Sequence, residues 1–102
     1  MRNLIVVDRN VVQLQRCALY AHSVPLLNEH HVCPESWFRA AGKPVVSPFE
    51  ALCPSCHTAV HVAIDSLLKQ RDVSLLPPRC VALAREAFRL AEINGLTPAP
   101  TL

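Results

Sequence analysis

The sequence has 102 residues, of which 51% are hydrophobic and 18% are charged, and its formal net charge is +2. This composition excludes a disordered chain, and the length suits one small domain. The low net charge neither requires nor excludes a nucleic-acid partner, because a local basic patch can carry such binding. A domain of this size buries only a modest core, so a bound metal ion is a common supplement to its stability.

The first third of the chain predicts short strands followed by a loop. Residues 3–7, with an apolar run from residue 4, predict a short buried strand, and residues 11–14 predict a second extended piece that leads to Cys17. Residues 17–28 contain cysteine, histidine, proline and asparagine, which favours a knuckle or loop. The run at residues 4–7 is too short for the core of a signal peptide or for a membrane span.

The middle of the chain predicts a strand, a short helix and a connector. Residues 29–32 predict a strand that ends before Pro34. Residues 35–41 predict about two helical turns, and Gly42 follows them as a suitable C-terminal cap. We expect residues 43–48, which include two prolines, to be a connector.

The last part of the chain predicts two helices and a tail. Apolar residues at helical spacing predict one helix over about residues 56–69. A second helix is expected over residues 78–94, because two prolines suit its start and Gly95 suits its end. Residues 97–102 are expected to be a flexible tail. We therefore expect residues 1–96 to form a single small α+β domain of the α/β class.

Cysteine usage indicates a reducing compartment. The chain has five cysteines, and we expect no signal peptide because the N-terminal apolar run is too short; an odd number of cysteines in such a chain argues against a disulfide framework. We therefore expect a cytoplasmic protein without a membrane partner, whose thiols are available to a metal ion. Cys33 and Cys80 fit buried structural thiols better than ligands.

Four of the five histidines lie between residues 30 and 61, in an ordered pattern. The first element is the pair His30-His31. The second is Cys53-x-x-Cys56-His57-x-x-x-His61, in which the two histidines are four residues apart and share one helix face. Two imidazoles placed in this way can bind one metal ion, and a Cys-x-x-Cys turn can present two thiolates to a zinc ion.

Residues 29–61 resemble the HNH endonuclease family, and the segment from residue 17 to residue 61 resembles its zinc-containing branch in bacteria and phages. The resemblance implies a ββα-metal (His-Me finger) core over residues 29–69, with an added C-terminal helix. It also implies that His30, His57 and His61 bind the catalytic ion, that His31 is the general base, and that Glu29 is the acidic residue beside the pair.

The function that the resemblance implies is hydrolysis of DNA phosphodiester bonds in a bacterial host cell. A neutral histidine can take a proton from water near pH 7, and a divalent ion (Mg²⁺, Mn²⁺, Ni²⁺ or Zn²⁺) can act as a Lewis acid. Besides DNA, a phage packaging enzyme or a host protein is an expected partner.

The expected structural zinc site departs from the family pattern. Cys53 and Cys56 supply one pair of ligands and Cys17 a third, but Tyr20 stands where the family has a second upstream cysteine. Either His22 or Cys33 can complete the site, and position along the chain favours His22. The alternative is a site whose zinc is weakened or lost.

A second departure concerns the family asparagine that orients the loop and the base. Pro48 stands at that place, with Ser47 beside it as a substitute that has a small polar side chain. The competing hypothesis is therefore a catalytically impaired module of the same fold that binds DNA or a host or packaging protein.

Overall fold

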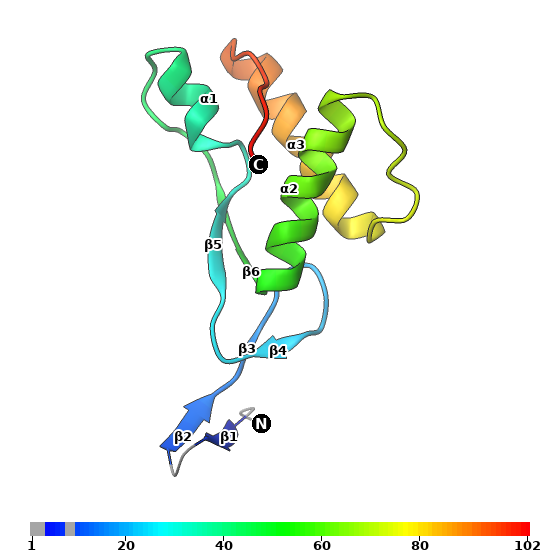
Figure 1. Ribbon diagram of the computed structural model, residues 1–102. Coiled ribbons are helices and arrows are strands. Elements are labelled where there is room, and N and C mark those ends of the chain that lie inside the picture. The colour runs from blue at the N-terminus through cyan, green and yellow to red at the C-terminus, as the bar shows by residue number, and fades with distance from the viewer. Residues whose placement is uncertain (1–3, 8–9) are drawn as a thin grey trace.

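The computed structural model describes residues 4–7 and 10–102 (Figure 1). Within these ranges, short strands form antiparallel two-stranded sheets and three helices complete a small α+β structure. Residue 3 of the expected first strand, and the expected burial of that strand's side chains, lie outside what the structure describes. No helix in the described ranges combines the length and the apolar character that a membrane crossing requires.

Two hairpins form the N-terminal part. β1 (Leu4–Val7) pairs with β2 (Asn10–Gln13), at the end of the molecule away from the helices (Figure 1). β3 (Gln15–Arg16) pairs with β4 (Ser23–Val24). The turn between β3 and β4 is closed by a backbone hydrogen bond of 2.9 Å from Cys17 N to His22 O, so the expected knuckle or loop over residues 17–28 contains a short hairpin turn and β4.

The third sheet carries the histidine pair. β5 (Asn28–His31) pairs with β6 (Phe49–Leu52), and His31 lies opposite Phe49 in the register. Sequence reasoning did not locate β6, because it follows a proline-containing connector and its sequence, FEAL, has no strong strand signal.

The expected short helix lies between these two strands. It is α1 (Glu35–Ala40), and it ends before Gly42, which adopts the left-handed conformation with φ 66°. Glycine adopts this conformation without the steric cost that a side chain would bring.

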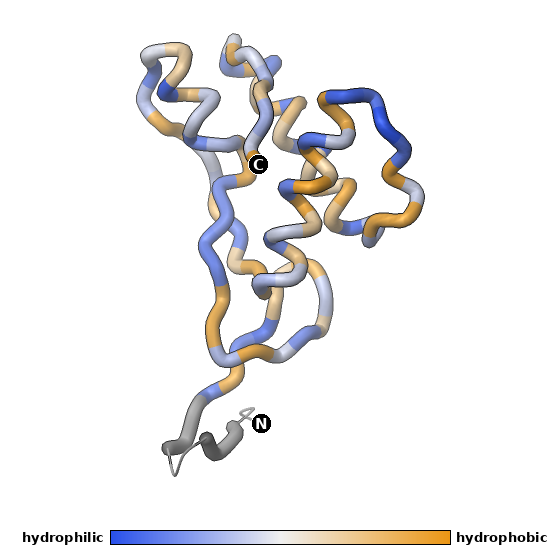
Figure 2. The backbone as a smooth tube through the Cα atoms, in the orientation of Figure 1, coloured by the Kyte–Doolittle hydropathy of each residue, from blue (hydrophilic) through white to orange (hydrophobic). Residues whose placement is uncertain are grey.

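Two longer helices follow. α2 (Pro54–Leu68) begins two residues earlier than expected, because the sulfur of Cys53 accepts a hydrogen bond from Cys56 N at 3.4 Å and caps the helix. α3 (Pro78–Asn94) has the expected bounds and ends at Gly95, with φ 65°. α2 packs along α3, and both helices alternate hydrophobic and hydrophilic stretches (Figure 2).

The hydrophobic core lies among the three helices and the β5–β6 sheet. Trp37 and Phe38 of α1 are each 1% exposed, and the buried alanines of α2 and α3 are 0–1% exposed. The buried core side chains of the two long helices are Cys56, Val60, Ala63, Ile64, Cys80, Val81, Ala84, Ala87 and Ala91.

The segment after α3 is held against the rest of the molecule, although a flexible tail was expected. The indole Nε1 of Trp37 donates a 2.8 Å hydrogen bond to Ala99 O. The carboxylate of Asp65 on α2 accepts from Thr101 N at 2.8 Å and from Leu102 N at 3.0 Å. A buried indole N–H and a largely buried carboxylate both need hydrogen-bond partners, and this segment supplies them.

Candidate metal centre

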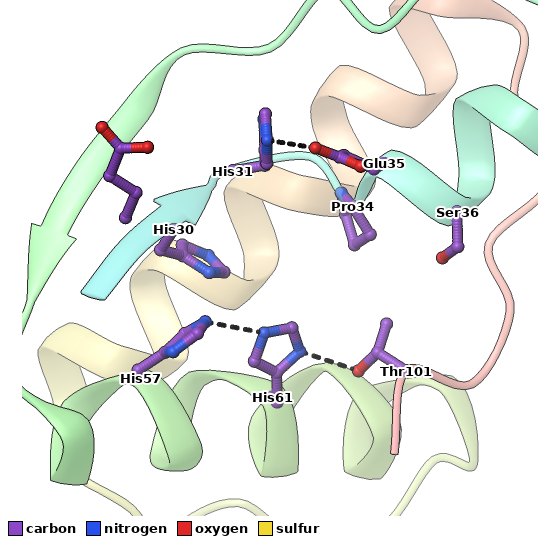
Figure 3. A pocket seen from close by; sticks show the side chains of 9 residues that line it. His30, His31, Pro34, Glu35, Ser36, His57, His61 and Thr101 are labelled. Carbon is purple, nitrogen blue, oxygen red and sulfur yellow. Dashed lines mark hydrogen bonds and ion pairs between the residues drawn. The ribbon is translucent and has the colours of Figure 1, made fainter.

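Three histidines from two elements converge on one point (Figure 3). His30 on β5 is 1% exposed, and its ring lies 5.2 Å from that of His57 and 5.3 Å from that of His61, centroid to centroid. His57 and His61 lie one turn apart on α2. One nitrogen from each histidine lies within 4.8 Å of the others.

The donor atoms fit a divalent metal ion. The Nε2 atoms of His57 and His61 lie 3.1 Å apart. Two nitrogens that each lie about 2.1 Å from one ion are roughly 3 to 3.4 Å apart. The Nε2 atom of His30 is buried and has no hydrogen-bond partner among the described residues, so a bound cation would satisfy it. The adjoining pocket of about 210 Å³ leaves room for further ligands.

The protonation of the three histidines suits metal binding. Burial, together with the charges of the neighbouring histidines, lowers the pKa of His30 to about 4. Burial also lowers the pKa values of His57 and His61, and for His61 the charge of Asp65 opposes this effect. All three imidazoles are therefore neutral at pH 7, the form in which they bind metals.

Two residues that sequence reasoning missed contact the outer nitrogens of the helical histidines. Asn28 Nδ2 lies 3.1 Å from His57 Nδ1, and Thr101 Oγ1 lies 2.9 Å from His61 Nδ1. Asn28 is two residues before His30 on a strand, so the alternation of side chains predicts that it shares the same face. Thr101 carries no sequence signal, because its contact depends on how the final segment folds back.

His31 lies beside the three-histidine cluster but points differently. Successive strand residues point to opposite faces, so its ring turns from α2 toward Phe49, with ring centroids 4.4 Å apart. Its Nε2 lies 2.6 Å from Oε1 of Glu35, whose other oxygen lies 2.8 Å from the guanidinium of Arg39. Its Nδ1 is buried and without a partner among the described residues.

The expected base, His31, lines the same pocket as the three expected metal ligands. His31 and Glu29 line it together with the three clustered histidines. Glu29 is exposed at its rim. The four histidines that the sequence singled out therefore share one cavity, although only three of them converge on one point.

The cysteines form a second cluster. Cys17, Cys53 and Cys56 are buried, and their sulfurs lie within 4.8 Å of one another. His22 Nδ1 lies 3.6 Å from Cys53 Sγ and 4.0 Å from Cys56 Sγ. A nitrogen and a sulfur bound to one zinc ion are roughly 3.6 Å apart. Of the two candidates for the fourth ligand, the structure brings His22 to this cluster, whereas Cys33 is not a member of it.

The thiols of this cluster interact electrostatically. Burial raises the pKa of Cys17, but backbone N–H groups, led by that of Cys53, outweigh it and bring this pKa to about 7. Burial and the neighbouring thiols raise the pKa of Cys56. Three thiols this close cannot all ionise without a cation among them, so the donor set fits a zinc ion that would stabilise the thiolates.

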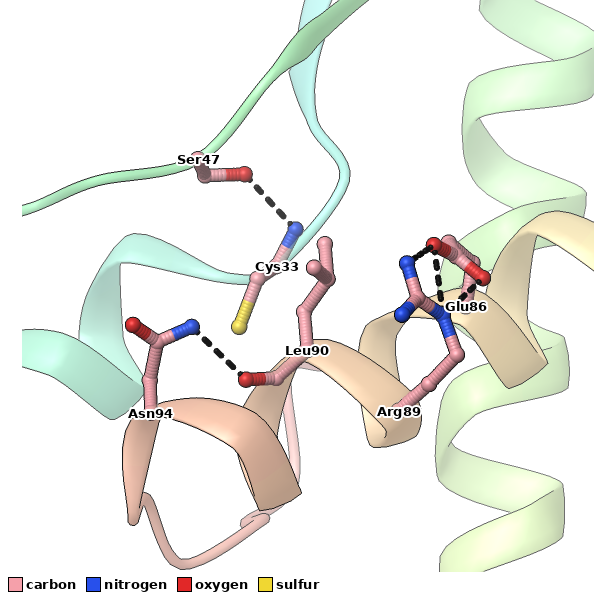
Figure 4. Close-up of polar contacts among 6 residues, drawn as sticks. All are labelled: Cys33, Ser47, Glu86, Arg89, Leu90 and Asn94. Carbon is pink, nitrogen blue, oxygen red and sulfur yellow. Dashed lines mark hydrogen bonds and ion pairs between the residues drawn. The ribbon is translucent and has the colours of Figure 1, made fainter.

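Cys33 lies outside the cysteine cluster, whereas the thiol of Cys80 adjoins it and interacts with Cys56. Burial raises the pKa of both thiols, and for Cys80 the hydrogen bond with Cys56 opposes this effect. The backbone N of Cys33 donates a 2.9 Å hydrogen bond to Ser47 Oγ (Figure 4). Pro48 O accepts a 3.0 Å bond from Val32 N. Ser47 and Pro48 therefore tie the connector to the residues that follow β5.

Comparisons of this chain with family models, with curated proteins and with solved structures found no match.

Proposed function

We propose that this protein is a metal-dependent endonuclease of the HNH type, which hydrolyses phosphodiester bonds in DNA. The proposal takes β5, β6 and α2 as a ββα-metal core. The observation that carries it is the meeting of His30, His57 and His61 within 4.8 Å, in a pocket that His31 also lines. A cluster of neutral imidazoles with an adjacent fourth histidine supplies both ligands and a base.

Each residue has a separate role in this proposal. His30, His57 and His61 hold the ion, and His31 removes a proton from the attacking water. When bound, the ion supplies Lewis acidity at the scissile phosphate and at the leaving oxygen. Glu29, exposed at the rim, helps to orient water at the mouth of the pocket.

The contact between His31 and Glu35 defines a resting arrangement. A carboxylate only accepts hydrogen bonds, so Nε2 of His31 carries a proton while it lies 2.6 Å from Glu35. The other ring nitrogen is buried. For His31 to accept a proton from water at Nε2, the carboxylate of Glu35 must turn away and the proton on Nε2 must move to Nδ1.

We assign the cysteine cluster to a structural zinc ion held by Cys17, Cys53, Cys56 and His22. This ion would join the β3–β4 turn to the first turn of α2. Cys56 directly precedes His57, so the same ion would fix the start of the helix that presents two catalytic ligands. A closed site of four protein ligands is typical of structural zinc.

The cellular setting follows from the family resemblance alone. We propose that DNA is the substrate, that the protein acts in the cytoplasm of a bacterial cell, and that a phage packaging enzyme or a host protein is a further partner.

The second candidate function is a metal-containing module that binds DNA or a partner protein without cutting. Two observations favour it. Nε2 of His31 contacts the carboxylate of Glu35 and is not free to accept a proton. Pro48 stands where the HNH family has an asparagine.

Plasmid cleavage by the purified protein with Mg²⁺, Mn²⁺, Ni²⁺ or Zn²⁺ separates these two functions. The comparison uses His31→Ala and His30→Ala, with bound metal quantified in every sample. We expect His31→Ala to lose cleavage while it keeps its metal, and His30→Ala to lose both. If the metal-loaded wild type cleaves with none of the ions, the nuclease is rejected and the binding module remains.

A further inference from the structure

The segment that follows α3 is hydrogen-bonded to one carboxylate, that of Asp65, and contacts the three-histidine cluster beside it. Asp65 lies one turn after His61 on α2 and is 9% exposed. Its Oδ1 accepts from Thr101 N at 2.8 Å and from Thr101 Oγ1 at 3.1 Å, and its Oδ2 accepts from Leu102 N at 3.0 Å. The hydroxyl of Thr101 also lies 2.9 Å from His61 Nδ1 and lines the pocket (Figure 3).

The direction of each hydrogen bond in this chain follows from the chemistry of the carboxylate. Asp65 only accepts, so the single hydroxyl proton of Thr101 is donated to Asp65. The oxygen of Thr101 then has only lone pairs to offer His61. His61 Nδ1 therefore carries the proton and donates to Thr101, and the lone pair of the ring lies on Nε2.

Nε2 is the atom of His61 that faces the cluster. It lies 3.1 Å from Nε2 of His57, on the side of the ring opposite Thr101. A metal-binding histidine commonly donates its other ring N–H to a carboxylate or to a group linked to one, which fixes the tautomer and the ring orientation.

We propose that Asp65 and Thr101 are positioning residues that hold His61 in the tautomer that binds metal. The segment after α3 is then part of the metal centre, although it lies outside the stretch that resembles the HNH family. This inference rests on the metal centre of the proposed function, but it does not depend on the reaction being DNA cleavage.

The docking of the segment does not depend on the hydroxyl of Thr101 alone. Trp37 Nε1 still bonds Ala99 O, and Asp65 still accepts from the backbone N–H groups of residues 101 and 102. Thr101→Val keeps the shape of the side chain and removes only the hydroxyl, whereas Thr101→Ser keeps the hydroxyl. Thr97→Val makes the same change at an exposed site on the same segment and is the matched control.

Two measurements on the full chain test this inference. The ¹⁵N chemical shifts of the imidazole nitrogens in the metal-free protein report the tautomer of His61. A Co²⁺ titration reports affinity at the histidines through the ligand-field bands. The thiolate-to-cobalt charge-transfer band reports the cysteine cluster in the same sample and serves as an internal control.

We expect the wild type, Thr101→Ser and Thr97→Val to share the Nδ1–H tautomer of His61 and the same cobalt affinity. Thr101→Val should lose that single tautomer and bind cobalt at the histidines roughly tenfold more weakly, with the charge-transfer titration unchanged. The inference is overturned if Thr101→Val matches the wild type in both measurements, or if the wild-type histidines bind no cobalt. A wild type that behaves as expected here but leaves plasmid DNA intact contradicts only the nuclease.

Discussion

The Nε2 atom of His31 lies 2.6 Å from Oε1 of Glu35, one helical turn further along the chain. This contact places a carboxylate on one ring nitrogen of His31, and the other, Nδ1, is buried without a partner among the described residues. If His31 is the base, Glu35 competes with water for it.

We therefore predict that Glu35→Ala speeds DNA cleavage at neutral pH. The contact is partly exposed and is worth about 0.5–1 kcal/mol, which corresponds to a two- to fivefold higher rate. Glu86→Ala is the matched control, because Glu86 pairs with Arg89 on the surface of α3, away from the pocket. The measurement is the initial rate of plasmid nicking by the wild type and the two variants. Slower cleavage by Glu35→Ala would contradict the prediction and would mean that Glu35 assists His31.

A second prediction concerns Asn28 and His57. The amide nitrogen of Asn28 lies 3.1 Å from His57 Nδ1, so that ring nitrogen accepts and the proton lies on Nε2, facing His61. A metal ion requires the opposite tautomer, in which Nδ1–H needs an acceptor. Asn28→Asp provides a carboxylate there, so we expect about tenfold tighter Co²⁺ binding at the histidines. Asn94→Asp on α3 is the control, and an unchanged or weaker affinity in Asn28→Asp would contradict the tautomer argument.

The stability of the metal-free protein should depend on the protonation of His30. Its pKa is about 4 in the folded protein and 6.5 as the ordinary value, so the unfolded chain binds the extra proton first. Stability is therefore complete above pH 6.5 and falls as the pH is lowered toward 4, by up to about 3 kcal/mol.

Urea unfolding of the metal-free protein at pH 7, 5.5 and 4 measures this loss. In His30→Gln the side chain cannot titrate, so the decline over the same range should be smaller than in the wild type. Equal declines in both proteins would assign the effect to other groups.

The cysteine cluster yields a test of the structural zinc. Cys17→Ser removes one of three clustered thiols, so zinc affinity at this site should fall by more than about 100-fold and the melting temperature should drop. Cys33→Ser is the matched control, because Cys33 is equally buried but lies outside the cluster. Zinc content and thermal unfolding with and without a chelator separate the two, and equal zinc retention by both variants would argue against the site.

Local features of the fold were predictable because short-range signals dominate them. The apolar spacing within α2 and α3 and the glycines at residues 42 and 95 indicated the helices and their ends. The strand β6 was missed because a strand is stabilised by its partner. Its partner β5 is almost twenty residues away, so pairing is decided by tertiary contacts.

The candidate site divides in the same way. The spacing of His57 and His61 alone places both imidazoles on one helix face, and the sequence alone supplies the His30-His31 pair and the Cys-x-x-Cys turn. Only the tertiary structure decided that His30 lies beside the two helical histidines and that His22 lies beside the clustered thiols. The contacts of Glu35 with His31 and of Thr101 with His61 were likewise visible only in the folded structure. Side-chain periodicity is a property of the local backbone, whereas these contacts join residues whose distance is set by how strands, helices and the final segment pack together.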